Sequence, residues 1–386
     1  MGRADGRGSV SKGGGRFKLR VVSTRITRRA MLVLLPASLA AQTRGRSIKP
    51  RARPLPSVGE FVRFADPSTE TPVVRLTSTG SASLLPAPAN HFVSVKERFL
   101  MFSSDRSGKF APFKVDLRSG LLRQVAETSN LLPLSLSLAS HERSLYFIDG
   151  GELKEAELVR PKVETLADSV ASFSAGPIGS GVFAVRGGKL QHVNGREITT
   201  LAEDVSDECL ARPGAQAGCL FVRHQGGGMR EFWCASPMTA GGTRPVLLAS
   251  GRISDPYWTP QGQSIIFLRD VSRGDTLFAE IHEVAASGGA ESLVTPTSQF
   301  AAFSPNGDGS VFVGASRSKA QPDVMLLLRS GHSEMTLCEH RSSQPAQVCP
   351  VFSPDARRVY FQSDRQGKPA IYSVNVELLV EPLVTG

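Results

Sequence analysis

A strand-turn-strand unit that recurs along the chain constrains the fold more than any other feature of the sequence. Its sharpest copy is VFSPDARRVYFQSDRQGKPAIYSVNV, at residues 351–376, where a Ser-Pro-Asp turn precedes one β-rich run and a Ser-Asp-Arg-x-Gly turn precedes the next. The second turn also occurs about 260 positions earlier, in RFLMFSSDRSGKFAPFKVDL at residues 98–117. Val, Ile, Phe and Tyr are frequent in these runs, and Gly, Pro, Asp and Ser bound them, which is typical of short strands.

Seven copies of the unit at similar spacing predict a β-propeller. One large apolar residue in each copy marks the repeat, and these anchor residues lie about 36 to 48 positions apart, the length of a four-stranded blade. The anchor residues are Phe102, Phe147, Phe183, Phe221, Phe267, Val313 and Phe361. Because a single blade cannot cover both faces of its sheet, stacking blades around an axis buries them. We therefore predict an all-β, seven-bladed propeller, closed by an N-terminal strand from residues 61–79.

Two other β architectures explain the pattern less well. An open β-solenoid uses shorter repeats, and a pair of β-sandwiches would not share one turn motif between such distant residues. The 37 Gly and 25 Pro, together with only 21% charged residues, also suit a turn-rich β protein better than a helical or disordered one.

The basic residues are concentrated at the N-terminus. Residues 1–41 contain nine Lys or Arg and one acidic residue, so they account for most of the formal net charge of +10. The remaining sequence has no run of Lys or Arg interleaved with aromatic residues, and nucleic acid is not an expected partner.

The same N-terminal region predicts export. A basic stretch leads into AMLVLLPASLAA, at residues 30–41, which ends in small residues and is too short for a permanent membrane span. The pair Arg28 and Arg29 fits a twin-arginine signal or an ordinary secretory signal equally well. We predict an export signal at residues 1–41, a linker at 42–58 and one propeller domain at 59–386, forming a bacterial periplasmic or secreted monomer.

The five cysteines leave disulfide pairing open. They show no CxxC spacing for zinc and are too few for a disulfide scaffold. In an oxidising compartment Cys219 could pair with Cys234, or Cys338 with Cys349. Buried free thiols are an equal alternative.

Propeller geometry also predicts a ligand site. The loops that enter the innermost strands and those that join the second and third strands emerge on one face, around the central channel. His224 ends the predicted strand CLFVR at residues 219–223, and several other polar residues precede innermost strands. These are Asp255, Gln344, Gln347 and Cys349, with Arg212 near the start of an earlier blade. Residues from different blades can therefore converge on one ligand.

The body of the chain resembles the oligogalacturonate lyases. The pieces that carry the resemblance include VVRLT at residues 73–77, FSSDRSG at 102–108, FVRH ending in His224, YWTPQG at 257–262 and CPVFSP at 349–354. Similar pieces occur in TolB-like and WD40-like binding propellers. The resemblance implies a seven-bladed propeller that cleaves short pectin fragments by β-elimination with a divalent metal, typically manganese.

The resemblance also implies roles for individual residues. His224 matches the catalytic histidine, which removes the proton next to a uronate carboxylate, and Arg212 matches an arginine that grips this carboxylate. At the metal, Gln344 matches the family's glutamine, while Asp255, Gln347 and Cys349 stand where the family has histidines. Asp and Gln oxygens suit manganese or calcium, but a thiol is poorly matched to these hard cations.

Two hypotheses of function follow. In the first, the chain is a divergent lyase of short uronate oligosaccharides in pectin catabolism. In the second, it is a non-catalytic TolB-like or WD40-like propeller that binds a glycan or an envelope protein. The replaced histidines leave the choice between enzyme and binding protein open.

Overall fold

The computed structural model describes most of the chain after the predicted linker. It describes residues 59–379, apart from 161, 178, 196, 207, 215–216, 237–243, 275 and 298. The predicted export signal and linker, at residues 1–41 and 42–58, lie outside the described residues. None of the helices found in the described part is long and apolar enough to cross a membrane.

Seven antiparallel sheets build the described fold, and in sequence order we call them blades one to seven. Blade one contains β3 (Ser83–Leu84), β4 (Phe99–Ser104), β5 (Ala111–Asp116) and β6 (Leu122–Gln124). Blade two contains β7 (Ser137–Leu138), β8 (Ser144–Asp149), β9 (Glu152–Glu157) and β10 (Val163–Ala167), preceded by the 3-10 turn η1 (Pro133–Ser135). Blade three contains β11 (Val170–Ala175), β12 (Val182–Arg186), β13 (Lys189–Asn194) and β14 (Glu197–Glu203).

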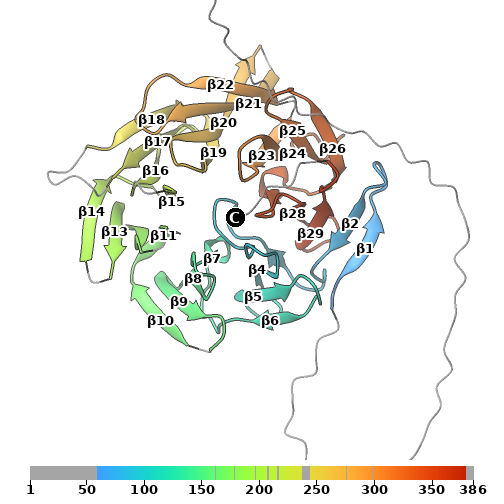
Figure 1. The fold of residues 1–386 in the computed structure, drawn as a ribbon, viewed down its shortest axis with the longest axis horizontal. Coiled ribbons are helices and arrows are strands. Elements are labelled where there is room, and N and C mark those ends of the chain that lie inside the picture. Colours follow the sequence, from blue (N-terminus) through green and yellow to red (C-terminus); the bar gives the residue numbers. More distant parts are fainter. Residues whose placement is uncertain are drawn as a thin grey trace, which may run out of the picture. The chain divides into compact units, whose positions relative to one another are not determined.

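The next three blades repeat this order. Blade four contains β15 (Cys209–Ala211), β16 (Cys219–His224), β17 (Arg230–Ala235) and β18 (Val246–Gly251). Blade five contains β19 (Ile253–Trp258), β20 (Ser264–Arg273), β21 (Thr276–Ala285) and β22 (Ser292–Thr297). Blade six contains β23 (Phe300–Pro305), β24 (Val311–Ser316), β25 (Asp323–Leu328) and β26 (Glu334–Glu339). The sheets surround a common centre, with the first strand of each blade innermost (Figure 1).

The seventh blade joins two distant parts of the sequence. After the 3-10 turn η2 (Pro345–Gln347), it contains β27 (Val351–Phe352), β28 (Arg358–Ser363) and β29 (Ala370–Asn375), followed in space by β2 (Pro72–Arg75) and β1 (Val62–Ala65). Val73 lies opposite Val374, and the amide of Ile371 donates a 3.0 Å hydrogen bond to Oγ1 of Thr77. The strand that completes the ring therefore comes from the N-terminal side.

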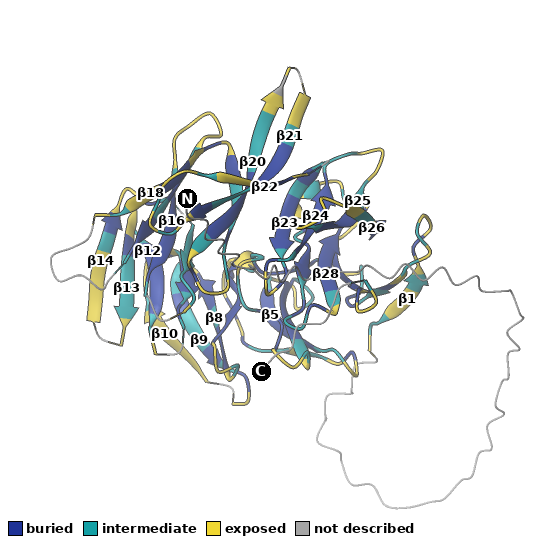
Figure 2. Cartoon of the chain, turned by 45° about the horizontal axis from the view of Figure 1, so that its top comes forward, coloured by how far each residue is buried: buried dark blue, intermediate teal, exposed yellow. Residues whose placement is uncertain are grey.

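The anchor residues occupy equivalent places in this fold. Each lies in the second strand of its blade, and none is more than 1% exposed. The innermost and middle strands carry most of the buried residues, whereas outer strands such as β10 and β14 are exposed (Figure 2). The prediction of an all-β, seven-bladed propeller is confirmed.

Arginines near the ends of second strands tie neighbouring blades together. Arg269 of blade five donates to the carbonyl of Ser250 in blade four, at 3.1 Å. Arg317, which follows β24, donates to the Asp270 carboxylate of blade five, at 3.0 Å. Since charge-assisted hydrogen bonds are the stronger ones, these contacts help to fix the blades around the channel.

Candidate functional site

A segment that follows β3 fills part of the space between the innermost strands. The backbone amide of Ala87 donates to the carbonyl of Leu134 at 3.0 Å, and Nδ2 of Asn90 donates to the carbonyls of Leu134 and Leu136. The amide of Leu138 donates to the carbonyl of His91. The segment thus rests on blade two and lines cavities of the channel.

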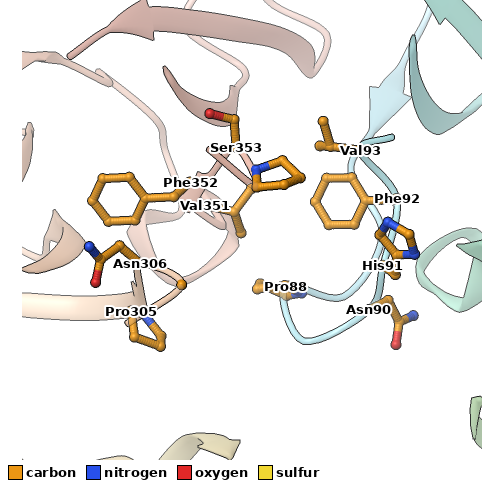
Figure 3. Close-up of a pocket in the computed structure, with 12 residues that line it drawn as sticks. Pro88, Asn90, His91, Phe92, Val93, Pro305, Asn306, Val351, Phe352 and Ser353 are labelled. Carbon is orange, nitrogen blue, oxygen red and sulfur yellow. The ribbon is translucent and has the colours of Figure 1, made fainter. Parts of the chain in front are cut away.

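Among the described residues, one of three cavities at this segment has little charge. It has a volume of about 210 Å³ and lies between residues 88–93 and the turns at 305–307 and 351–354 (Figure 3). Asn306, one of its few polar groups, is 4% exposed and already bonds to Ser310 and Val311. Burial lowers the pKa of His91, which keeps this imidazole neutral. The lining gives little basis for recognising a charged ligand.

The larger cavity combines apolar walls with three charged groups. It has a volume of about 430 Å³ and is bounded by residues of blades two to five and by the segment after β3. Its charged lining residues are Glu208, Arg230 and Asp255. Concave sites with a few polar groups among apolar walls are typical of ligand pockets. This cavity is the candidate functional site.

His224 and Arg230 lie side by side at one end of blade four, and Arg230 lines this cavity. They are directly opposite each other on β16 and β17, which places their Cβ atoms about 5 Å apart on one face of the sheet. Leu220 and Val222 share that face, because strand side chains alternate, and both line the cavity. His224 is exposed and lies directly opposite Arg230, although it is not itself one of the residues that line the cavity.

Arg230 also holds an acidic partner. Its Nη1 lies 3.4 Å from Oε1 of Glu208, and both side chains are partly exposed. An exposed pair of this kind is weak, and a guanidinium has five donors. Arg230 can therefore donate hydrogen bonds to a ligand carboxylate without first breaking a strong ion pair with Glu208.

Asp255 is placed by an irregularity in β19. Its φ is 49°, and the register of β19 with β20 shifts between Ser254 and Tyr257. The side chain keeps some accessible surface in the cavity, yet it lies deep in the protein. Burial raises its pKa to about 7, with a further rise from Glu208 and opposing effects from Ser254 and Arg230.

This carboxyl makes stability depend on pH. The folded protein keeps the Asp255 proton up to about pH 7, whereas the unfolded chain loses it near the ordinary aspartate pKa of 3.8, so stability falls as pH rises between these values. We expect Asp255→Asn to be about 2 to 4 kcal/mol more stable than the parent at about pH 8, and similar to it at about pH 4. Urea denaturation in the presence of EDTA measures this. An equal difference in unfolding free energy between variant and parent at both pH values would contradict a raised pKa of Asp255.

Arg212 lies at the other end of β16 from His224. Ala211 is opposite Cys219, the first residue of β16, whereas His224 is the last. Arg212 donates from Nε to the carbonyl of Gly262 at 2.5 Å, and its guanidinium covers the Trp258 ring at 5.5 Å. The structure therefore does not bring Arg212 and His224 together, and Arg212 packs between blades.

The four residues at the predicted metal site form no complete ligand set. Gln344 and Gln347 are exposed at η2, and the carbonyl of Gln347 accepts a hydrogen bond from Gln362. Burial and the nearby Asp255 carboxyl raise the pKa of the Cys349 thiol to about 12, and a protonated thiol is a poor ligand. Across the described ranges, no three His, Cys, Asp or Glu side chains gather as a metal site. These residues do not fit manganese, and we assign no step to a metal.

The five cysteines are free in the structure. Cys234 lies opposite Leu220 on the neighbouring strand, so its side chain and that of Cys219 point to opposite faces of blade four. A bond between these two thiols is excluded by this register.

Arg230 and Glu208 are the site residues that the sequence analysis missed. A signal for Arg230 was present, because a Gly-rich turn at residues 226–228 follows the strand that ends at His224. The amide of Gln225 donates to the carbonyl of Met229 and closes this turn. Working out the hairpin register would have placed Arg230 opposite His224.

Comparison with known proteins identifies the fold. No protein-family model and no curated protein matches the chain. An oligogalacturonate lyase solved in complex with manganese superposes with a TM-score of 0.72 at 17% identity, covering 83% of this chain and 96% of that one. An oligogalacturonate lyase from Vibrio parahaemolyticus gives 0.71 at 18% identity, covering 82% and 96%. Hydrazine synthase from Kuenenia stuttgartiensis gives 0.55 at 12% identity, covering 74% and 95%. The chain thus has the propeller fold seen in the oligogalacturonate lyases.

Proposed function

We propose that the chain cleaves short uronate oligosaccharides by β-elimination, with His224 as the base and Arg230 as the carboxylate contact. The observation that carries this proposal is the position of these two residues, directly opposite each other on β16 and β17, with Arg230 lining the charged cavity. The fold shared with oligogalacturonate lyases supports it. In this proposal Arg230 takes the role that the sequence resemblance gave to Arg212.

The chemistry requires a base and a cation close together. A guanidinium bound to the uronate carboxylate stabilises the charge that develops when the adjacent C5 proton is removed. His224 receives that proton, the electron pair forms the C4–C5 double bond, and the C4–O bond breaks. The leaving oxygen takes a proton from water and His224 returns its proton to the solvent, so one glycosidic bond yields an unsaturated sugar and a free hydroxyl.

Turnover of digalacturonate tests the proposal. We expect the full-length chain to produce the ultraviolet absorbance of the unsaturated product, and to do so in EDTA as well as with added manganese. Arg230→Gln should lower kcat/KM at least about tenfold, because a charge-assisted contact to the substrate is lost. No product from the parent chain, where a known oligogalacturonate lyase gives one, would contradict the elimination step.

A second candidate is binding without cleavage. It is favoured by the incomplete ligand set around Asp255 and Cys349, since metal-dependent elimination needs a cation there. In that case calorimetry would detect uronate binding that Arg230→Gln weakens, while no unsaturated product forms. The same pair of measurements therefore separates the two candidates.

The N-terminal segment is the basis for a proposal on where the protein is located. We propose export to the periplasm or the medium, because residues 1–41 combine a basic stretch with a short apolar run. A monomer is the proposed state. Cell fractionation and size-exclusion chromatography test these two points.

A further inference from the structure

The larger cavity has an apolar side that a simple uronate oligosaccharide does not need. Leu132, Leu134 and Ile148 come from blade two, and Phe173 comes from blade three. Leu132 and Leu134 are 44% and 46% exposed, although both belong to the innermost part of their blade. Apolar side chains exposed together in a concave site indicate a ligand that covers them.

The two leucines are held in place by their own backbone. The amide of Leu132 donates to the carbonyl of Ile148 at 2.9 Å, and its carbonyl accepts a bond from the amide of Ser135 at 3.0 Å. The carbonyl of Leu134 accepts bonds from Ala87 and Asn90. Since these contacts fix the turn at η1, the apolar surface is already formed before a ligand arrives.

The charged lining residues and the two exposed leucines belong to different blades. Glu208, Arg230 and Asp255 belong to blades four and five or to the connections that lead into them, whereas Leu132 and Leu134 belong to blade two. A ligand that fills the cavity therefore meets a charged side and an apolar side. An unsubstituted oligogalacturonide carries hydroxyl groups along its length, and desolvating them against leucine is unfavourable.

We propose that the preferred ligand is a uronate glycoside with an apolar aglycone, such as an aryl group, whose carboxylate contacts Arg230 and whose apolar group covers Leu132 and Leu134. This inference rests on the proposed uronate site and names the class of ligand that it binds. Burying the aglycone adds binding free energy that a second sugar does not supply.

Calorimetry with three small ligands tests the proposal on the full-length chain. Phenyl galacturonide carries both groups, methyl galacturonide only the carboxylate, and phenyl galactoside only the ring. We expect phenyl galacturonide to bind at least about tenfold more tightly than either of the others. Leu134→Asn should remove most of the advantage over methyl galacturonide.

A matched control separates the cavity from general surface effects. Leu121 is also 44% exposed but does not line the cavity, so Leu121→Asn should leave all three affinities unchanged. Equal binding of phenyl and methyl galacturonide would overturn the aglycone inference while the uronate site stands. Equal binding of phenyl galacturonide and phenyl galactoside would instead overturn the uronate site, and the inference with it.

Discussion

Replacing His224 with alanine is expected to lower kcat/KM for digalacturonate about 100-fold or more, the usual contribution of a general base. The change should appear mainly in kcat, because Arg230 still binds the carboxylate and the base acts only in the transition state. His224 is exposed at the end of β16, so its removal creates no cavity in the core. Initial rates of product absorbance, measured over a range of substrate concentrations, give both constants.

A second histidine provides the control for this variant. His141 is also exposed, and it lies in the turn between β7 and β8, so it belongs to the opposite end of its blade. His141→Ala should turn over substrate like the parent. If His224→Ala also retains full turnover, the base is another group and the proposed role is wrong.

Gly314→Ala is expected to destabilise the fold by at least about 3 kcal/mol. Gly314 lies in the middle of the buried strand β24, and a Cβ atom there would overlap the ring of Phe300. Phe300 is fully buried and cannot turn away without moving its neighbours. Urea denaturation of parent and variant measures the change.

Another glycine shows whether the effect depends on this contact. Gly80 is exposed, has no positive φ, and an added Cβ would meet only Oγ of Ser78 at an ordinary 3.5 Å. Gly80→Ala should be within about 0.5 kcal/mol of the parent. A Gly314→Ala protein as stable as Gly80→Ala would mean that the core around Phe300 can rearrange.

The repeat made the fold predictable because every copy must bury its second strand between neighbouring blades. Phe221 and Phe267 occupy equivalent second strands, and each must be apolar so that neighbouring blades can stack. The placement of His224 at the end of such a strand was predictable for the same reason.

The site itself depends on features that do not repeat. The register of one Gly-rich hairpin places Arg230 opposite His224. Asp255 has a positive φ and lies where the register between β19 and β20 shifts, and both features set the position of its side chain. Arg212 precedes the turn into β16 rather than following that strand, so the two residues that similarity of short motifs grouped together lie at opposite ends of β16. Sequence patterns indicate which residues form strands, but such local geometry decides which polar groups meet.

The pairing of β2 with β29 affects how the protein folds during synthesis. The hydrogen bond between Thr77 and Ile371 spans 294 residues, so the ring stays open until nearly the whole chain has left the ribosome. Blades one to six can assemble by contacts between neighbours, but β2 waits with an unpaired edge that invites aggregation. Until β29 emerges, that edge can pair with another chain.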